Sequence, residues 1–286
     1  GHFVAGDDPE PFGVKNMSQF EAMATIMQFL KHPPTLSAIP TDTPAEDLRV
    51  RHGGYDIRAA EKDPNVAFPL ALLRQKVAVV GAGRTDAGVH AKQMFCHLDV
   101  DAISDIDDLV YRLNAFLPDD IAIQGIFQVA DDAHARFDAV ERTYEYWLVK
   151  EKDPFLFDCA HFIKQPLDVD AMNQAAKILL DYTDFECFSK SNTDVKTFNC
   201  DVREAFWKVD EDKWVFTIAA DRFLRNMVRA VVGTLLDVGM GKMSPEGIHQ
   251  VIASKDRGEA GASVPAKGLY LTKVSYPKEI FNEQKG

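Results

Sequence analysis

The sequence predicts an α+β fold made of two similar halves that meet at a seam. Strand-like runs such as "KVAVVGA" (residues 76–82) and "VERTYEYWLV" (residues 140–149) alternate with helix-like stretches, and the second half repeats the style of the first. The chain has 286 residues, of which 46% are hydrophobic, so it can bury one large core or two moderate ones. A seam between such halves is a place where ligand sites tend to form.

The elements of the first half follow from apolar spacing and from capping residues. In residues 17–30, apolar side chains recur at helical spacing and Ser18 stands at the N-cap, which predicts a helix. A buried strand is expected over 76–82, a helix capped by Ser104 and ended at Pro118, and a strand over 120–129. The strand over 140–149 is predicted by its alternation.

The second half gives similar signals. A helix is expected from about Val169, after the capping residue Asp168, and a strand over 213–220. The next helix is expected from about Phe223 to Val238, with Gly239 at its end. A short helix opened by Ser244 and Pro245 and a last strand over 268–276 complete the chain.

Three regions are therefore expected along the chain. Residues 1–75 contain Pro-rich and acidic stretches and differ in character from the rest; the family resemblance described below implies an atypical N-terminal region, with either an insertion or a replaced N-terminus. Residues 76–132 supply the remainder of the first half, and residues 133–286 form the second half.

Composition limits the function classes. A formal net charge of −12 argues against non-specific coating of nucleic acid, because such binding needs many Lys and Arg contacts to phosphate, so any nucleic-acid surface must be a local patch. The four cysteines are scattered without a metal-ligand spacing, and neither a disulfide framework nor a zinc site is expected. No apolar run reaches membrane-spanning length and the first residues do not resemble a secretory signal, which predicts a cytoplasmic protein without membrane contact.

The string "GAGRTDAGVHA" is the first candidate for chemistry. Its glycines follow a strand and permit a tight turn or a close approach by a substrate, and Asp86 would be presented at the strand end beside Arg84. A turn or cap role for Asp86 and a solvated Arg84 are the structural alternative for these two residues.

A second candidate lies in "HARFDAVERTYEYWL". Alternation in a strand places Arg142, Tyr144 and Tyr146 on one face, and aromatic rings beside a cation suit an unpaired base with its phosphate. The alternative is that both tyrosines are half-buried sheet residues.

The third candidate is "DRFLRNMVRAVVGTLLDVG". Arg222, Arg225 and Arg229 are spaced by three and four residues, so a helix through them would carry one basic stripe in its first two turns. The macrodipole disfavours cations there, which calls for an anionic partner. Arg229 lies deepest in the apolar pattern and is expected to form a semi-buried ion pair, whereas a solvated face is the plainer interpretation of the stripe.

Taken together these strings resemble the TruA family of tRNA pseudouridine synthases. The resemblance runs from about residue 77 to about residue 277 and rests on five strings in the family's order: "VVGAGRTDAGVHA", "NAFLPDDIAI", "DAHARFDAVERTYEYWL", "RFLRNMVRAVVGTLLDVGMGK" and "GLYLTKVSYP". The nine residues GRTDAGVHA are far more specific than a lone R-T-D.

The resemblance implies two ferredoxin-like (RRM-like) halves that share a long antiparallel sheet, with helices on one face and a central catalytic cleft. It implies a homodimer that isomerises uridine to pseudouridine at positions 38 to 40 of the tRNA anticodon stem-loop, without metal or organic cofactor.

Matched motif to motif, each candidate residue receives a role. Asp86 takes the place of the catalytic nucleophile, Arg84 that of an RNA-contacting arginine, Tyr144 that of the tyrosine stacked on the flipped base, Arg229 that of the arginine paired with the aspartate, and Leu269 that of an apolar residue of the uracil pocket. Arg142, Arg222 and Arg225 remain expected substrate contacts.

Two other functions compete with this one. A module of the same architecture that binds RNA without turnover would not need Asp86, Tyr144 and Arg229 together. A glycoside-cleaving enzyme also breaks a bond at C1′, but it would need paired carboxylates at one site, and the sequence indicates no second one.

Overall fold

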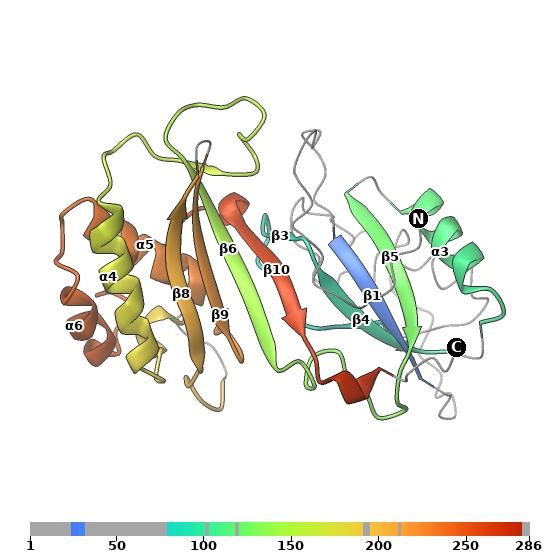
Figure 1. The fold of residues 1–286 in the computed structure, drawn as a ribbon. Coiled ribbons are helices and arrows are strands. Elements are labelled where there is room, and N and C mark those ends of the chain that lie inside the picture. Colours follow the sequence, from blue (N-terminus) through green and yellow to red (C-terminus); the bar gives the residue numbers. More distant parts are fainter. Residues whose placement is uncertain are drawn as a thin grey trace, which may run out of the picture.

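The computed structural model describes residues 79–100, 103–117, 120–190, 195–210 and 213–281, together with the backbone of 24–31. Within these ranges the chain folds into two sheets with helices packed against them, which confirms the predicted α+β class (Figure 1). No helix in the described ranges is long and apolar enough to cross a membrane.

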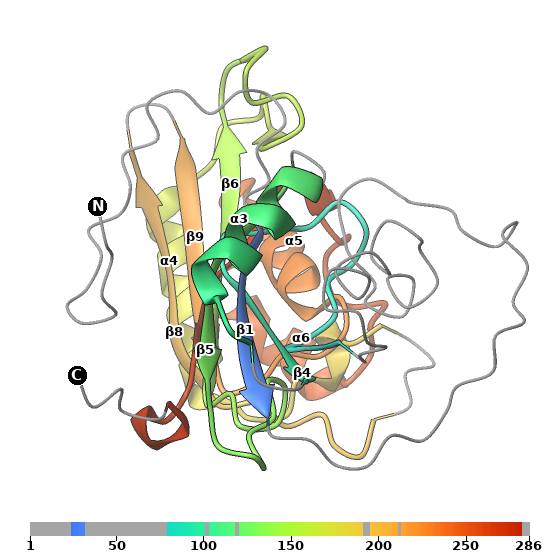
Figure 2. The same cartoon turned by 90° about the vertical axis from the view of Figure 1, so that its right-hand side faces the viewer.

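The smaller sheet belongs to the first half of the chain. Its four strands lie in the order β2 (Val80–Gly81), β4 (Met94–Asp99), β1 (Ala24–Lys31) and β5 (Ile121–Gln128). Strand β1 runs parallel to both of its neighbours, whereas β2 and β4 are antiparallel. Helix α3 (Ile106–Phe116) packs its buried leucines against β5, and Figure 2 shows it lying across the strands.

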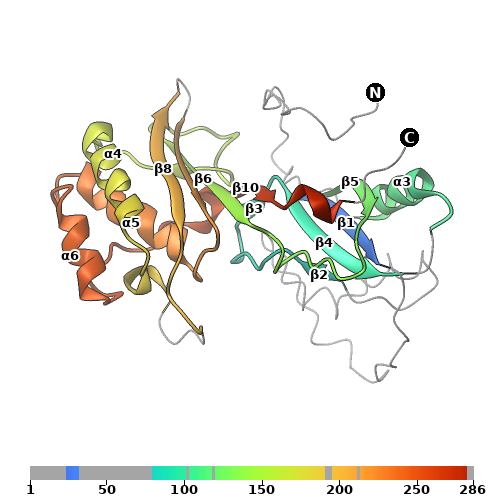
Figure 3. The same ribbon diagram turned by 60° about the horizontal axis from the view of Figure 1, so that its bottom comes forward.

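The larger sheet has the strand order β3 (His90–Ala91), β10 (Leu269–Ser275), β6 (Glu141–Val149), β9 (Trp214–Ala220) and β8 (Val202–Val209), and β7 (His161–Phe162) pairs with β6. Helices α4 (Val169–Ile178), α5 (Met227–Gly239) and α6 (Gly247–Ser254) lie on one side of this sheet (Figures 1 and 3). Short 3₁₀ turns occur at Leu179–Asp181, Glu186–Phe188, Ala266–Gly268 and Lys278–Ile280.

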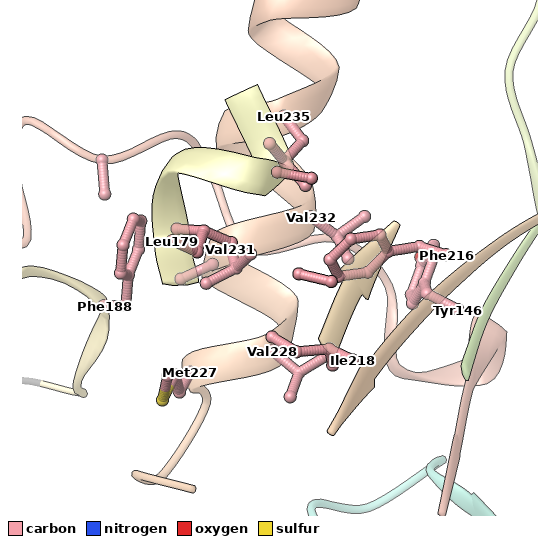
Figure 4. Packing of buried hydrophobic residues seen from close by; sticks show 14 of the residues in the cluster. Tyr146, Leu179, Phe188, Phe216, Ile218, Met227, Val228, Val231, Val232 and Leu235 are labelled. Carbon is pink, nitrogen blue, oxygen red and sulfur yellow. The ribbon is translucent and has the colours of Figure 1, made fainter. Parts of the chain in front are cut away.

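The main core lies between α5 and this sheet. Eleven of the thirteen residues of α5 are buried, and Val228 and Val232 face Ile218 and Phe216 of β9 (Figure 4). Burying a side chain of this size stabilises the fold by about 1.5 to 3 kcal/mol. This packing fixes α5, including its first turn, against the larger sheet.

The two sheets meet through a segment that passes from one to the other. Strand β3 pairs with β10 in the larger sheet, and β4 belongs to the smaller sheet only three residues later. Between them, the amides of Lys92 and Gln93 both donate to the carbonyl of Leu271. The expected single antiparallel sheet is thus replaced by two joined sheets, each with some parallel pairing, because the chain changes sheets at this point.

The predicted helix over 17–30 is wrong for the residues that the structure describes. Ala24–Lys31 forms β1, in the middle of the smaller sheet, whereas Ser18 lies outside the described residues. A short apolar run is compatible with a helix or a strand, and pairing on both sides decides for the strand.

Several helix ends differ from expectation. Helix α3 is capped by Asp105 rather than Ser104, since the Asp105 carboxylate accepts the amide of Asp108 at 2.9 Å. Helix α5 begins at Met227 rather than Phe223, because Asn226 has a left-handed φ of 68° that a helix cannot include. Helix α6 begins after Glu246, past the expected opening residues Ser244 and Pro245.

Most of the other elements are confirmed. Strands β5, β6, β9 and β10 and helix α4, with Asp168 as its cap, lie where the sequence predicts them. Of the strand expected over 76–82, residues 79–82 are described, and within them Val80–Gly81 form β2. Strands β4 and β8 were not predicted.

Candidate active site at the junction of the two sheets

The loop 82–89 crosses the junction, because it leaves β2 of the smaller sheet and enters β3 of the larger one. Within it, the amide of Val89 donates to the carbonyl of Asp86 at 3.1 Å, which closes a four-residue turn. Gly88, the third residue of that turn, has φ of +84°, a value that favours glycine. Asp86 opens this turn and is therefore presented at the junction.

Arg229 lies in the first turn of α5 and is held by the loop that precedes β10. Its Nε donates to the carbonyl of Val264 at 2.7 Å, and the amide of Val264 donates to the carbonyl of Arg229 at 3.2 Å. The loop approaches α5 closely at two glycines, Gly233 and Gly261, where a Cβ atom would lie 1.9 Å and 2.6 Å from backbone atoms. Small residues thus set the distance between the helix and the loop.

Asp86 and Arg229 form an ion pair across the junction. Arg229 Nη1 donates to Asp86 Oδ2 at 3.0 Å, although the two residues are 143 positions apart in sequence. Their side chains are 28% and 22% exposed, so the pair is half-buried but open to solvent on one side. The carboxylate compensates a cation at the N-terminal end of a helix, as the macrodipole requires.

Tyr144 stands beside this pair on β6. Its ring meets Phe223 edge-on, with centroids 5.1 Å apart, and the residue is half-buried. Burial raises the pKa of Tyr144 to about 12; the nearby Arg142 opposes this shift and Asp86 adds to it. The phenol is therefore neutral at physiological pH, and it lies close enough to Asp86 for the carboxylate to influence its pKa.

Tyr146 and Leu269 lie one step further along the sheet. They are paired across β6 and β10, and both are buried. The hydroxyl of Tyr146 donates to the carbonyl of Pro265 at 2.8 Å, next to the residue that holds Arg229. Tyr146 is thus a core residue with a satisfied hydroxyl, and Leu269 belongs to the hydrophobic cluster against which Tyr144 packs.

The three other arginines predicted to contact substrate outside β6 differ in their exposure to solvent. Arg84 and Arg225 are exposed, whereas Arg222 is half-buried and donates to the carbonyl of Thr197 at 3.3 Å. Because α5 begins at Met227, Arg222 and Arg225 lie in the loop before it and do not form a helical stripe with Arg229. Their expected contact with substrate stays a prediction.

The guanidinium of Arg142 is surrounded by backbone carbonyls, and burial lowers the pKa of Arg142 from its ordinary value.

The sequence did not indicate two further residues of the site. No sequence signal indicated the Val264 carbonyl that holds Arg229, and Phe223 was predicted inside a helix although it lies in the loop before α5. Among the described side chains, no group of three His, Cys, Asp or Glu is arranged to hold a metal ion.

Comparison of the sequence with known proteins identifies one family. Residues 175–277 match the family model described as tRNA pseudouridine synthase. The tRNA pseudouridine synthase A of Parabacteroides distasonis is 53% identical over 211 residues, which cover 73% of this chain and 84% of that protein.

More distant relatives agree. The tRNA pseudouridine synthase A of Porphyromonas gingivalis is 51% identical over 214 residues, covering 73% of this chain and 85% of that protein. That of Bacillus subtilis is 40% identical over 231 residues, covering 78% and 93%. The chain, with its Asp86–Arg229 pair at the junction of two sheets, belongs to the tRNA pseudouridine synthase A family.

Proposed function

We propose that this protein isomerises uridine to pseudouridine at positions 38 to 40 of the tRNA anticodon stem-loop, with Asp86 as the nucleophile. The observation that carries the proposal is the 3.0 Å pair between Asp86 and Arg229, close to which Tyr144 lies on β6. Membership of the family supports the substrate class and the reaction.

The reaction needs no co-reactant. The bond between N1 of uracil and C1′ of ribose breaks, the base turns, C5 bonds to C1′, and the proton of C5 leaves while N1 gains one. One carboxylate must act while the detached uracil is held. As the nucleophile, Asp86 attacks either C1′ or the uracil ring; in the alternative, glycal route it would act first as a base that removes a ribose proton.

The other residues of the site position the carboxylate and the substrate and take no part in bond making or breaking. Arg229 orients the carboxylate, and Tyr144 offers its ring to the extruded base, whose unstacking costs less in a loop than within a duplex. Arg84, which is exposed two residues before Asp86, is in position to contact the RNA around the displaced nucleotide. Leu269 supports the apolar side of the uracil pocket.

The decisive experiment is incubation with an unmodified tRNA transcript, followed by mapping of pseudouridine. Transcripts with U replaced by C at position 38, 39 or 40 test the site assignment, and each should lose modification only at the replaced position. Tight tRNA binding without any pseudouridine would favour the competing RNA-binding module.

We also infer a cytoplasmic homodimer, in which basic residues of two copies meet on one face while acidic residues populate the outside. The net charge of −12 makes such segregation necessary for binding a polyanion. Light scattering on the full chain at working concentration should give twice the monomer mass, and fractionation of cells should place the protein with soluble tRNA.

A further inference from the structure

The guanidinium of Arg142 lies among four backbone carbonyls. Its Nη1 donates to Asp221 O at 2.9 Å and to Ala139 O at 3.3 Å. Its Nη2 donates to Arg136 O at 2.8 Å and to Ala82 O at 3.1 Å. The two terminal nitrogens carry four of the five N–H groups of an arginine, and all four have partners.

These carbonyls come from separate parts of the chain. Ala82 is buried at the start of the loop that carries Asp86, four residues later, and its amide donates to Phe95 of the smaller sheet at 2.7 Å. Asp221 follows β9 of the larger sheet and precedes the loop with Arg222. Arg142 therefore ties the root of the catalytic loop to both sheets.

The same contacts oppose the expected role of Arg142 as an RNA contact. A phosphate that approached the terminal nitrogens would have to displace carbonyls that are already hydrogen-bonded to them. A part-buried carbonyl that loses its donor without a new partner destabilises the fold. The exposed Arg84 and Arg225 do not face this cost.

We propose that Arg142 is a positioning residue, which fixes the Asp86 loop against the larger sheet by bonding Ala82 and Asp221 at once. As a statement about catalysis, this rests on the function proposed above. A planar fork is required for the task, because one ammonium cannot reach carbonyls on both sides of the guanidinium.

The substitution Arg142→Lys separates the two roles, because it keeps the charge and removes the fork. If Arg142 positions the loop, hydrogen exchange in residues 82–89 and 221–226 should rise severalfold in the free protein, while exchange in α3 is unchanged. The single-turnover rate at saturating tRNA should fall by about 10- to 100-fold, as expected for a displaced catalytic group.

The salt dependence of tRNA binding tests the alternative role of Arg142 as a phosphate contact. In an Asp86→Asn background, where turnover is absent, the tRNA affinity of Arg142→Lys and Arg142→Gln should keep the salt dependence of the parent. A phosphate contact predicts near-normal activity for Arg142→Lys, and for Arg142→Gln a salt slope lower by roughly one unit. Either of these results would overturn the proposal.

Two controls complete the test. Arg112→Lys, on the exposed face of α3 where Arg112 pairs with Asp108, should behave as wild type in every assay. Loss of the folded state in both Arg142 variants, seen by circular dichroism, would show a global structural role and reject local positioning. If the wild type itself makes no pseudouridine, the proposed function fails, whereas the exchange experiment still decides whether Arg142 holds the loop.

Discussion

In the proposed mechanism, Asp86 is the carboxylate that takes part in the chemical step. Asp86→Asn is nearly isosteric and can still accept a hydrogen bond from Arg229, so we expect a folded protein that binds tRNA and makes no pseudouridine, because an amide is a far weaker nucleophile.

The matched control for this change is Asp237→Asn. Asp237 lies near the other end of α5 and pairs with Lys242 at 2.8 Å, away from the junction. Pseudouridine formation and melting temperature should be measured on the same preparations. A turn role for Asp86 predicts retained activity with about 1 kcal/mol or less of lost stability, and that result would reject the mechanism.

Arg229 is the partner of that carboxylate, and we expect Arg229→Ala to reduce turnover far more than tRNA affinity. The pair is neither exposed nor fully buried, so its loss should cost about 1 to 3 kcal/mol of stability, between the values for surface and buried pairs. Single-turnover rates and urea denaturation give the two quantities. Wild-type rates in a folded variant would contradict the pairing role.

Tyr144 should act through its ring. A phenol whose pKa is raised to about 12 by burial is a poor base at neutral pH, so Tyr144→Phe should keep tRNA binding and lose less than about 100-fold in rate. Tyr144→Leu should lose both binding and turnover, because it removes the stacking surface.

The exposed Tyr111, replaced by Phe, provides a control on α3. A much larger loss of rate in Tyr144→Phe, with normal binding, would show that the hydroxyl takes part in proton transfer. Equal and normal binding by the Phe and Leu variants would make Tyr144 a sheet residue only.

At the scale of elements, the loop before α5 replaces the basic helical stripe that the sequence suggested. We expect Arg225→Ala to lower the salt slope of tRNA binding by roughly one unit, since Arg225 is exposed, and Arg222→Ala to lower it less, since Arg222 already bonds Thr197. Affinity should be measured between low and physiological salt, with Arg112→Ala as the control. An unchanged slope in both variants would assign these arginines to a solvated surface.

The close contact between α5 and the loop before β10 also positions a residue of the site. Gly233→Ala would place a methyl group 1.9 Å from the carbonyl oxygen of Ala262, so the loop must move, and with it the Val264 carbonyl that holds Arg229. We expect about 1 to 3 kcal/mol of destabilisation and a lower rate at saturating tRNA.

Gly258→Ala is the control for that substitution. The nearest atom to its added methyl group would be a side-chain oxygen of Asp256 at 3.3 Å, which can move aside. Thermal melts and single-turnover rates should separate the two variants. Full activity in Gly233→Ala would show that the position of Arg229 tolerates a shifted loop.

At the scale of the whole molecule, the site depends on how the two sheets are joined. Asp86 comes from the connection between the sheets, whereas Arg229 and Tyr144 belong to the larger sheet and its helix. Neither half alone brings the carboxylate and its partner together. The segment at Lys92 and Gln93, bonded to Leu271, and the carbonyl contacts of Arg142 connect the halves at the place where the site forms.

The sequence by itself determined the class of fold and three strands of the larger sheet, β6, β9 and β10, because alternation and caps are local signals. The strands in "VERTYEYWLV" and "KWVFTIAA" and the helix after Asp168 needed no tertiary information. The string GRTDAGVHA likewise indicated Asp86, and an apolar neighbourhood indicated an ion pair for Arg229.

Only the tertiary structure decided which groups the arginines bond and whether a short apolar run forms a helix or a strand. Residues 24–31 became a strand because two neighbours pair with it, and α5 began four residues late because Asn226 takes a left-handed conformation. Arg142 bonds four carbonyls, which the sequence did not indicate, and its predicted contact with substrate stays a prediction. Such contacts depend on which backbone groups meet in space, and spacing along a chain does not encode them.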